Sequence, residues 1–410
     1  MEETGQTEER VILVAVQAGI STDAEDSLDE LEELARTAGA VTVGKIIQNR
    51  EEVHPGTYIG KGKIEEVRSL IYAMDATGII CDDELSPAQF NNLERELECK
   101  IMDRTLLILD IFAAHAVTSE GKIQVELAQL RYRAARLSGL GSSLSRLGGG
   151  IGTRGPGEKK LETDRRLIRA RISALKKELV QVEKHRQLIR EGRSRNNIKT
   201  AAIVGYTNAG KSTLLNKLTG ADVLSENKLF ATLDPTTRLM NLKDGQQILL
   251  TDTVGFINKL PHHLVEAFKS TLEEAVYADY IIHVVDASSP KAEMQMQVVY
   301  ETLKELGALG KKTITLFNKQ DMPEAHQIRD MKADYSLKIS AKTGEGLDEL
   351  DALLGKILTE EQIYFERLFS YQEAGKIGLI REYGQVLSEE YTQDGVAVKA
   401  RVPREIYPRL

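Results

Sequence analysis

The stretch Gly205-Tyr206-Thr207-Asn208-Ala209-Gly210-Lys211-Ser212-Thr213 decides the fold expected of this chain. It matches G-x-x-x-x-G-K-[ST], a loop that wraps phosphate groups. The apolar run 200–204 before it predicts a strand, and the run 214–218 after it predicts a helix. In that setting backbone N–H groups and a positive helix end converge on an anion. We therefore expect Lys211 to reach the outer phosphates of a nucleotide and Ser212 to hold Mg²⁺; the alternative is a chance glycine turn.

The choice of base is predicted by a second segment, Asn318-Lys319-Gln320-Asp321, which follows the apolar run 313–317. It resembles the Asn-Lys-x-Asp element of the Ras-like GTPases. The Asp321 carboxylate can accept from N1–H and the 2-amino group of guanine, which adenine does not offer, so the wrong base leaves a partner unmatched. Ser340-Ala341-Lys342 resembles the last guanine-contacting loop of that superfamily. Together these segments favour GTP over ATP.

A third segment, Asp252-Thr253-Val254-Gly255-Phe256, has the form Asp-x-x-Gly after a predicted strand. We expect Asp252 to hold Mg²⁺ through water and the Gly255 backbone to approach the γ-phosphate. In Ras the next residue is a Gln that orients the attacking water. Here it is Phe256, which either packs in the core or lies near the nucleotide but cannot position water. The sequence thus predicts slow intrinsic hydrolysis that a partner or a bound cation stimulates.

Between these motifs lies Phe230-Ala231-Thr232-Leu233-Asp234-Pro235-Thr236-Thr237, where a switch loop should carry a threonine to Mg²⁺ and the γ-phosphate. The segment contains three threonines that could fill this role, Thr232, Thr236 and Thr237, and the residues alone do not distinguish them. Asn208 resembles the Asn of potassium-activated GTPases, which makes K⁺ a candidate ion beside the phosphates. The alternative for Asn208 is a polar residue without a catalytic role.

The charge of the chain is unevenly distributed. The 410 residues carry a net charge of −8, yet residues 131–199 contain 19 Lys/Arg and 6 Asp/Glu, about +13. This asymmetry favours one polyanion-binding element on an acidic body. Two cysteines form no metal or disulfide pattern, no apolar run reaches membrane-spanning length, and the first ten residues are not a secretory leader. We expect a cytoplasmic location, no zinc site and no membrane span.

Four domains are predicted along the chain: a small α/β domain at 1–120, a basic helical hairpin at 121–197, a nucleotide-binding domain at 198–360 and a small α+β domain at 361–410. Alternating strands and helices favour a parallel sheet in the first. In the last, the short apolar runs 377–380 and 396–400 are predicted to be strands. In the second, residues 158–193 repeat apolar side chains every seven residues, as coiled coils do. Their expected partner is the helix at 122–136, with a glycine-rich tip loop at 139–157. Arg146, Arg154, Lys159 and Lys160 lie on or beside this tip and suit RNA contact.

With these segments in view, the chain resembles the HflX family of ribosome-associated GTPases. The resemblance covers residues 1 to about 360 and rests on segments 205–213, 230–238 and 252–256. It also rests on 125–130 (VELAQL) and 155–158 (GPGE), which lie outside the nucleotide-binding domain. It implies a P-loop GTPase that binds the large ribosomal subunit and its rRNA and separates ribosomal subunits under stress, with the tip loop near the peptidyl-transferase region. It also selects Thr232 as the switch threonine.

The resulting expectations are explicit. Catalysis is assigned to Lys211, Thr232 and Gly255, and Mg²⁺ to Ser212 and Thr232. The residues expected to contact nucleotide are Gly205, Tyr206, Thr207, Asn208, Ala209, Gly210, Lys211, Ser212, Thr213, Phe230, Ala231, Thr232, Leu233, Asp234, Asp252, Thr253, Val254, Gly255, Asn318, Lys319, Gln320, Asp321, Ser340, Ala341 and Lys342. We expect a monomer that does not bind DNA. Three alternatives remain: a signalling switch that docks a protein, a tRNA-modifying potassium-activated GTPase, and an ATP-using P-loop enzyme.

Overall fold

The structure, a computed structural model, describes residues 8–19, 23–144, 156–195, 198–221, 229–230, 233–259, 261, 269–404 and 406–410. The chain divides into two compact units. The first contains Met1–Val182, Glu226–Asp234 and Ile257–Thr271, and the second contains Glu183–Ser225, Pro235–Phe256 and Leu272–Leu410. The division into four domains expected from the sequence stays a prediction.

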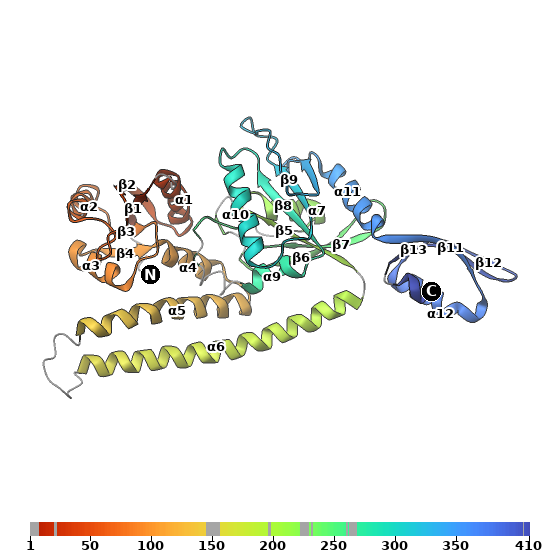
Figure 1. Ribbon diagram of the computed structural model, residues 1–410, viewed down its shortest axis with the longest axis horizontal. Helices are drawn as coiled ribbons and strands as arrows, with labels where there is room; N and C mark the ends of the chain where they lie inside the picture. The colour runs from red at the N-terminus through yellow and green to blue at the C-terminus, as the bar shows by residue number, and fades with distance from the viewer. Residues whose placement is uncertain are drawn as a thin grey trace, which may run out of the picture. The chain divides into compact units, whose positions relative to one another are not determined.

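The first unit begins with a four-stranded parallel sheet in the order β2-β1-β3-β4 (Figure 1). Its strands are β1 (Arg10–Ala18), β2 (Val41–Arg50), β3 (Gly78–Cys81) and β4 (Lys100–Asp103), and its helices are α1 (Ala24–Thr37), α2 (Lys61–Met74), α3 (Pro87–Leu97) and α4 (Arg104–His115). Helix starts follow the sequence signals: Asp23 caps α1, and Ser86 with Gln89 forms a capping box ahead of Pro87. The predicted α/β fold with a parallel sheet is confirmed.

Two long helices follow, α5 (Ser119–Leu144) and α6 (Pro156–Arg195), and the boundary between the units falls inside α6 after Val182. They run antiparallel, because Arg171 bonds Glu126 at 2.7 and 2.8 Å while Arg165 donates to the Leu137 carbonyl at 2.5 Å. Leu175, one of the residues of the predicted seven-residue repeat, is fully buried. The predicted pairing of the two helices is therefore confirmed.

The glycine-rich loop is shorter than expected, since residues 139–144 belong to α5 and 156–157 to α6. Propagating an existing helix gains one hydrogen bond per residue, so Gly139 and Gly141, at about 1 kcal/mol each, do not end it. Residues 145–155, which include Arg146 and Arg154, and the side chains of Lys159 and Lys160 lie outside the described residues.

The second unit is built on a six-stranded sheet in the order β10-β9-β8-β5-β7-β6, parallel except for the edge strand β6. Its strands are β5 (Lys199–Gly205), β6 (Thr236–Asn241), β7 (Gln247–Asp252), β8 (Tyr280–Asp286), β9 (Lys312–Asn318) and β10 (Tyr335–Lys338). Its helices are α7 (Lys211–Thr219), α9 (Lys269–Tyr277), α10 (Ala292–Glu305) and α11 (Leu347–Glu360). Burial on both faces explains the continuous apolar runs of β5, β8 and β9.

The chain ends in a three-stranded antiparallel sheet, β11-β13-β12, with a helix packed on one face. Its elements are β11 (Gln362–Phe369), η1 (Tyr371–Glu373), α12 (Ala374–Tyr383), β12 (Gln385–Thr392), β13 (Gly395–Pro403) and η2 (Tyr407–Arg409). The expected α+β character is confirmed, but the strand predicted at 377–380 is wrong. That segment lies in α12, where Ile377 and Ile380, three residues apart, both face the core. A four-residue apolar run does not distinguish strand from helix.

Candidate nucleotide-binding site

The phosphate-loop motif lies between β5 and α7, at the carboxyl end of a central strand, where open α/β sheets bind ligands. Gly210 has φ +97°, and a Cβ there would lie 2.3 Å from Asn318 Nδ2. At Gly205, with φ +155°, a Cβ would lie 2.3 Å from the Val284 carbonyl oxygen. Both glycines are required by backbone conformation and close packing together. The loop leads into the N-terminus of α7, where no side chain caps the helix.

Lys211 lies over this loop. Its side chain is buried, and Nζ donates to the Tyr206 carbonyl at 2.8 Å. Burial lowers the pKa of Lys211 to about 8, although Asp252 opposes the shift. A bound phosphate would supply opposite charge and raise that pKa again. The position fits the predicted role of Lys211 with the outer phosphates.

The predicted magnesium ligands are adjacent. Ser212 Oγ donates to Asp252 Oδ2 at 2.6 Å, and Asp252 is fully buried at the end of β7. Hydroxyl and carboxylate oxygens are the donors that Mg²⁺ prefers, with phosphate oxygens and water completing its shell. Within the described residues, no three His, Cys, Asp or Glu side chains are grouped to hold a metal. The residues present therefore fit a magnesium ion that arrives with a nucleotide; Thr232, the other expected ligand, lies outside the described residues.

The Asp-x-x-Gly segment is packed directly on the phosphate loop. The Thr207 N–H donates to the Phe256 carbonyl at 2.8 Å, and the Phe256 N–H donates to the Gly205 carbonyl at 3.1 Å. A Cβ at Gly255 would lie 2.9 Å from Lys211 Nζ, which explains the glycine. The Phe256 side chain is buried, so of the two expectations for it the structure favours packing in the core. Residue 256 supplies no polar group for water.

The base-recognition motif is held to the phosphate loop by Asn318. Its Nδ2 donates to the Ala209 carbonyl at 2.8 Å, and its Oδ1 accepts from the Ala341 N–H at 2.8 Å. Asp321 is exposed, and its Oδ1 accepts from Ser340 Oγ at 2.7 Å, which lowers the pKa of the carboxyl group. A carboxylate held ionised and facing solvent is suited to accept from guanine. Segments 205–213, 318–321 and 340–341 are thus brought together as expected.

One residue of this site was missed by sequence reasoning. Asp286, the last residue of β8, accepts from Lys319 Nζ at 2.7 Å. Lys319 has φ +64°, an uncommon conformation for a lysine, and the ion pair fixes its side chain. The available signal was position, because Asp286 ends the strand that lies between the two motif-bearing strands β5 and β9.

The switch segment is described only in part. Ala231 and Thr232 lie outside the described residues, whereas Phe230, Leu233 and Asp234 belong to the first unit. Their expected contacts with nucleotide stay predictions. Asn208 is exposed, with φ +59°, and its role with K⁺ also stays a prediction.

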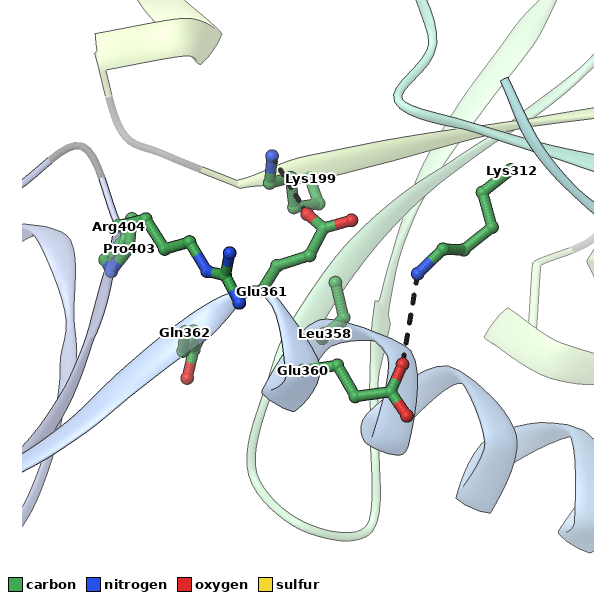
Figure 2. Close-up of a pocket in the computed structure, with 8 residues that line it drawn as sticks. All are labelled: Lys199, Lys312, Leu358, Glu360, Glu361, Gln362, Pro403 and Arg404. Carbon is green, nitrogen blue, oxygen red and sulfur yellow. Dashed lines mark ion pairs between the residues drawn. The ribbon is translucent and has the colours of Figure 1, made fainter. Parts of the chain in front are cut away.

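A large cavity elsewhere in the second unit is a poor candidate for the nucleotide. Figure 2 shows this cavity of about 680 Å³, which lies at the beginning of β5 and β9, not at their carboxyl ends. Its lysines face carboxylates: Lys199 lies 3.4 Å from Glu361, and Lys312 lies 3.9 Å from Glu360. Both lysines are thus ion-paired, and among the charged residues of the lining Arg404 is the remaining cation, so the cavity has no cluster of free cations for a nucleotide triphosphate.

The fold and this site define a P-loop GTPase. Residues 200–319 match the protein family described as 50S ribosome-binding GTPase, residues 25–113 match the GTP-binding GTPase N-terminal family, and residues 115–193 match the GTP-binding GTPase middle region. GTPase HflX of Lacrimispora saccharolytica is 67% identical over 409 residues, covering 100% of this chain and 97% of that protein. GTPase HflX of Caldanaerobacter subterraneus subsp. tengcongensis is 51% identical, covering 100% and 95%.

Among solved structures, a GTP-binding protein from Sulfolobus solfataricus in complex with GDP is 25% identical, with a TM-score of 0.46, covering 86% of this chain and 99% of that one. The full-length matches to the curated relatives show that the chain belongs to the HflX family of GTPases. The family expected from the sequence motifs is thereby confirmed, and GTP hydrolysis is the activity of this class.

Proposed function

We propose that this chain is a cytoplasmic, monomeric factor that binds the large ribosomal subunit and uses GTP to drive dissociation or recycling of ribosomal subunits, with stress as the setting. GTP and Mg²⁺ order the loop around Thr232, the ordered state lets the α5–α6 hairpin seat on rRNA, and hydrolysis releases it. The observation that carries the proposal is that one chain combines the phosphate-loop, Asp-x-x-Gly and base-recognition motifs with a strongly cationic pair of helices.

Support for a ribosomal partner comes first from the comparisons, since residues 200–319 match a family described as ribosome-binding. The second support is charge. Helix α6 exposes Arg166, Arg169, Lys176 and Lys177 to solvent, in the segment whose net charge is about +13. Phosphate backbones attract such surfaces and release counterions on binding. Among the helices of the described part of the chain, none has the length and hydropathy to cross a bilayer.

Support for stimulated hydrolysis comes from the site. Mg²⁺ bound with the nucleotide would neutralise charge on the phosphates. Of the chain's own residues, Lys211 is placed for the outer phosphates and Gly255 permits close backbone approach, but the buried Phe256 cannot orient water. A missing polar group of this kind is worth orders of magnitude in rate in related GTPases. We infer that ribosome contact supplies it, with K⁺ beside Asn208 as a further contributor.

The first experiment measures GTP turnover with and without purified large ribosomal subunits, in K⁺ and in Na⁺. We expect slow turnover alone and at least tenfold stimulation by the subunits, with a further increase in K⁺. Equal rates with and without subunits would refute the ribosomal role. Equal rates in the two salts would remove only the potassium site.

The second experiment tests the hairpin. Replacing Arg146, Arg154, Lys159 and Lys160 together by Ala should leave GTP affinity intact, weaken co-sedimentation with large subunits and flatten its salt dependence. A matched control replaces four exposed lysines of the second unit, Lys243, Lys304, Lys332 and Lys356. Normal co-sedimentation of the hairpin variant would contradict RNA contact at the tip. A complex that resists high salt would favour a protein-docking switch instead.

A further inference from the structure

Two segments that adjoin the nucleotide-binding motifs in the sequence belong to the first unit and not to the second. Residues 199–221 and 235–256 carry the phosphate loop, β6, β7 and Asp-x-x-Gly, and they belong to the second unit. The intervening segment Glu226–Asp234 and the following segment Ile257–Thr271 belong to the first. Two of the points at which the chain passes between the units therefore lie between Asp234 and Pro235, two residues after Thr232, and between Phe256 and Ile257. Both crossings lie where a GTPase is expected to respond to its γ-phosphate.

Asp234, at the first crossing, is bound to the base of the hairpin. Its Oδ2 accepts from the Val117 N–H at 3.0 Å and the Thr118 N–H at 2.8 Å, and its Oδ1 accepts from Thr118 Oγ1 at 2.5 Å. These groups immediately precede α5, whose N-terminus favours a negative charge. A Cβ at Gly121, in the first turn of α5, would lie 2.4 Å from Asp234 Oδ1. The lack of a side chain at Gly121 therefore allows the Asp234 carboxylate to approach the start of α5.

Apolar packing accompanies this contact. The rings of Phe230 and Phe112 are 4.7 Å apart and nearly perpendicular, and both are buried. Leu233, next to Asp234, is also buried. Phe112 belongs to α4, so Phe230 and Asp234, which flank Thr232 in the sequence, both contact other residues of the first unit.

Lys259, just beyond the second crossing, enters the carboxyl-end crevice of the four-stranded sheet. Its Nζ contacts Asp82, which directly follows β3, and lies 3.0 Å from Asp83 Oδ1. The chain reverses its strand order between β1 and β3, and open α/β sheets bind ligands at such a point. In this sheet the side chain of Lys259, from the same chain, occupies that position.

The crevice is organised around a buried arginine. Arg104 donates to Asp82 Oδ1 at 2.7 Å and also contacts Glu30, while Ser27 Oγ donates to Asp82 Oδ2 at 2.7 Å. Burial alone would lower the pKa of Lys259, but Asp82 and Asp83 outweigh it and raise that pKa, so the lysine stays charged. Lys259 adopts φ +52°, which is uncommon for a lysine and indicates that its contacts fix the backbone.

We propose that Asp234 and Lys259 are positioning residues for GTP hydrolysis, which hold the two nucleotide-responsive segments on the first unit and couple their state to the start of α5. Neither residue is assigned to the reacting atoms. The anchors act by restricting the segments beforehand, so that less conformational entropy is lost when GTP orders them. The coupling is a property of the isolated GTPase and can be tested without ribosomes.

The decisive variant is Gly121→Ala, which leaves both segments unchanged and pushes a methyl group into the Asp234 carboxylate. Ala favours helix over Gly, so the fold should be retained or stabilised while hydrolysis is impaired. Gly62→Ala is the matched control, because Gly62 is also helical and its Cβ would meet nothing within 4 Å. Lys259→Met tests the second anchor, with Lys63→Met, a half-buried, ion-paired lysine of the same unit, as its control.

Two readouts are measured on the full chain: the single-turnover rate of GTP hydrolysis, and amide hydrogen exchange of residues 117–121 with GDP or with a non-hydrolysable GTP analogue. We expect the Gly121 and Lys259 variants to hydrolyse GTP roughly tenfold more slowly, within the usual range of coupling between sites, with KM changed less than kcat. Wild-type exchange should differ between the two nucleotides, and Gly121→Ala should abolish the difference.

Unchanged or faster hydrolysis in both variants, or the same loss in the Gly62 and Lys63 controls, overturns the proposal. So does exchange at 117–121 that is the same with both nucleotides in the wild type. None of these outcomes bears on ribosome binding, which the turnover experiment with large subunits decides separately.

Discussion

The two units each contain a parallel sheet with polar residues at the carboxyl ends of its strands, yet they use that edge differently. In the six-stranded sheet, β5, β7 and β9 end in the phosphate loop, Asp252 and Asn318. In the four-stranded sheet, β3 and β4 lead to Asp82 and Asp103, and these carboxylates are taken up by Arg104, Lys259 and Arg136. The carboxyl edge of parallel strands thus forms a ligand site in one unit and an internal ion network in the other.

The difference arises from the residues at the carboxyl end of each strand. After β5 come glycines, which bring backbone N–H groups close to a ligand and leave space for it. After β3 and β4 come charged side chains long enough to fill the crevice. A buried charge must be paired, so an arginine between carboxylates closes the site to other ions.

The largest expected effect tests whether the crevice of the four-stranded sheet is structural. Asp82→Ala leaves the fully buried Arg104 with fewer partners and should lower the free energy of unfolding by about 3–5 kcal/mol. Denaturant unfolding measures it. The exposed Asp29, paired with Lys45, is the control and should cost less than about 1 kcal/mol when replaced by Ala. A small loss of unfolding free energy in Asp82→Ala would indicate that Arg104 does not depend on Asp82 and that this ion network is not structural.

The next effect tests whether the edge of the six-stranded sheet reads guanine. Asp321→Ala should reduce the preference for GTP over ATP by roughly a thousandfold. Without this carboxylate, guanine loses the acceptor for its N1–H and 2-amino groups, and adenine no longer leaves that acceptor unmatched. Competition of GTP and of ATP against fluorescent GDP gives the two affinities, and their ratio is the preference for GTP. Asp334→Ala, which changes an exposed carboxylate of the same unit, is the control. An unaltered preference would mean that other residues select the base.

Phosphate binding provides the third test of the same edge. Lys211→Ala should weaken GTP binding by roughly a hundredfold, since it removes the cation placed over the phosphate loop. Fluorescent nucleotide titration measures the affinity. The same substitution at Lys217, an exposed lysine of the same helix, should have little effect. Equal losses at both lysines would point to helix stability and not to phosphate contact.

The smallest effect concerns the core beneath the nucleotide site. Burial lowers the pKa of His283 to about 4, so the folded state binds its proton less readily than the unfolded chain does. Its contribution to stability is present above the unfolded pKa of about 6.5 and is lost as pH falls from there towards 4. Between pH 7 and 5.5 the loss should be about 1 kcal/mol. His283→Gln should show a flatter stability profile over that range; an unchanged profile would assign the pH dependence to other groups.

The sequence alone predicted which motifs the structure brings together at the candidate nucleotide site, because each motif is a contiguous run of residues whose chemistry can be recognised locally. The phosphate loop, Asp-x-x-Gly and Asn-Lys-x-Asp each follow an apolar run, and parallel strands bring such positions to one edge. The heptad spacing likewise predicted the partner of α6. Short apolar runs were less informative, and the segment 377–380 became a helix because only tertiary packing distinguishes the two periods.

Only the tertiary structure decided where Asp286, Asp234 and Lys259 lie. The carboxylate of Asp234 meets residues 116 and 117 positions earlier in the chain, and Lys259 meets Asp82 at a separation of 177. No local sequence pattern encodes such pairs, because the sequence around a charged loop residue is the same whether its side chain faces solvent or forms a buried ion pair. Their partners depend on how the whole chain buries its apolar surface, and that property belongs to the fold and to no single segment.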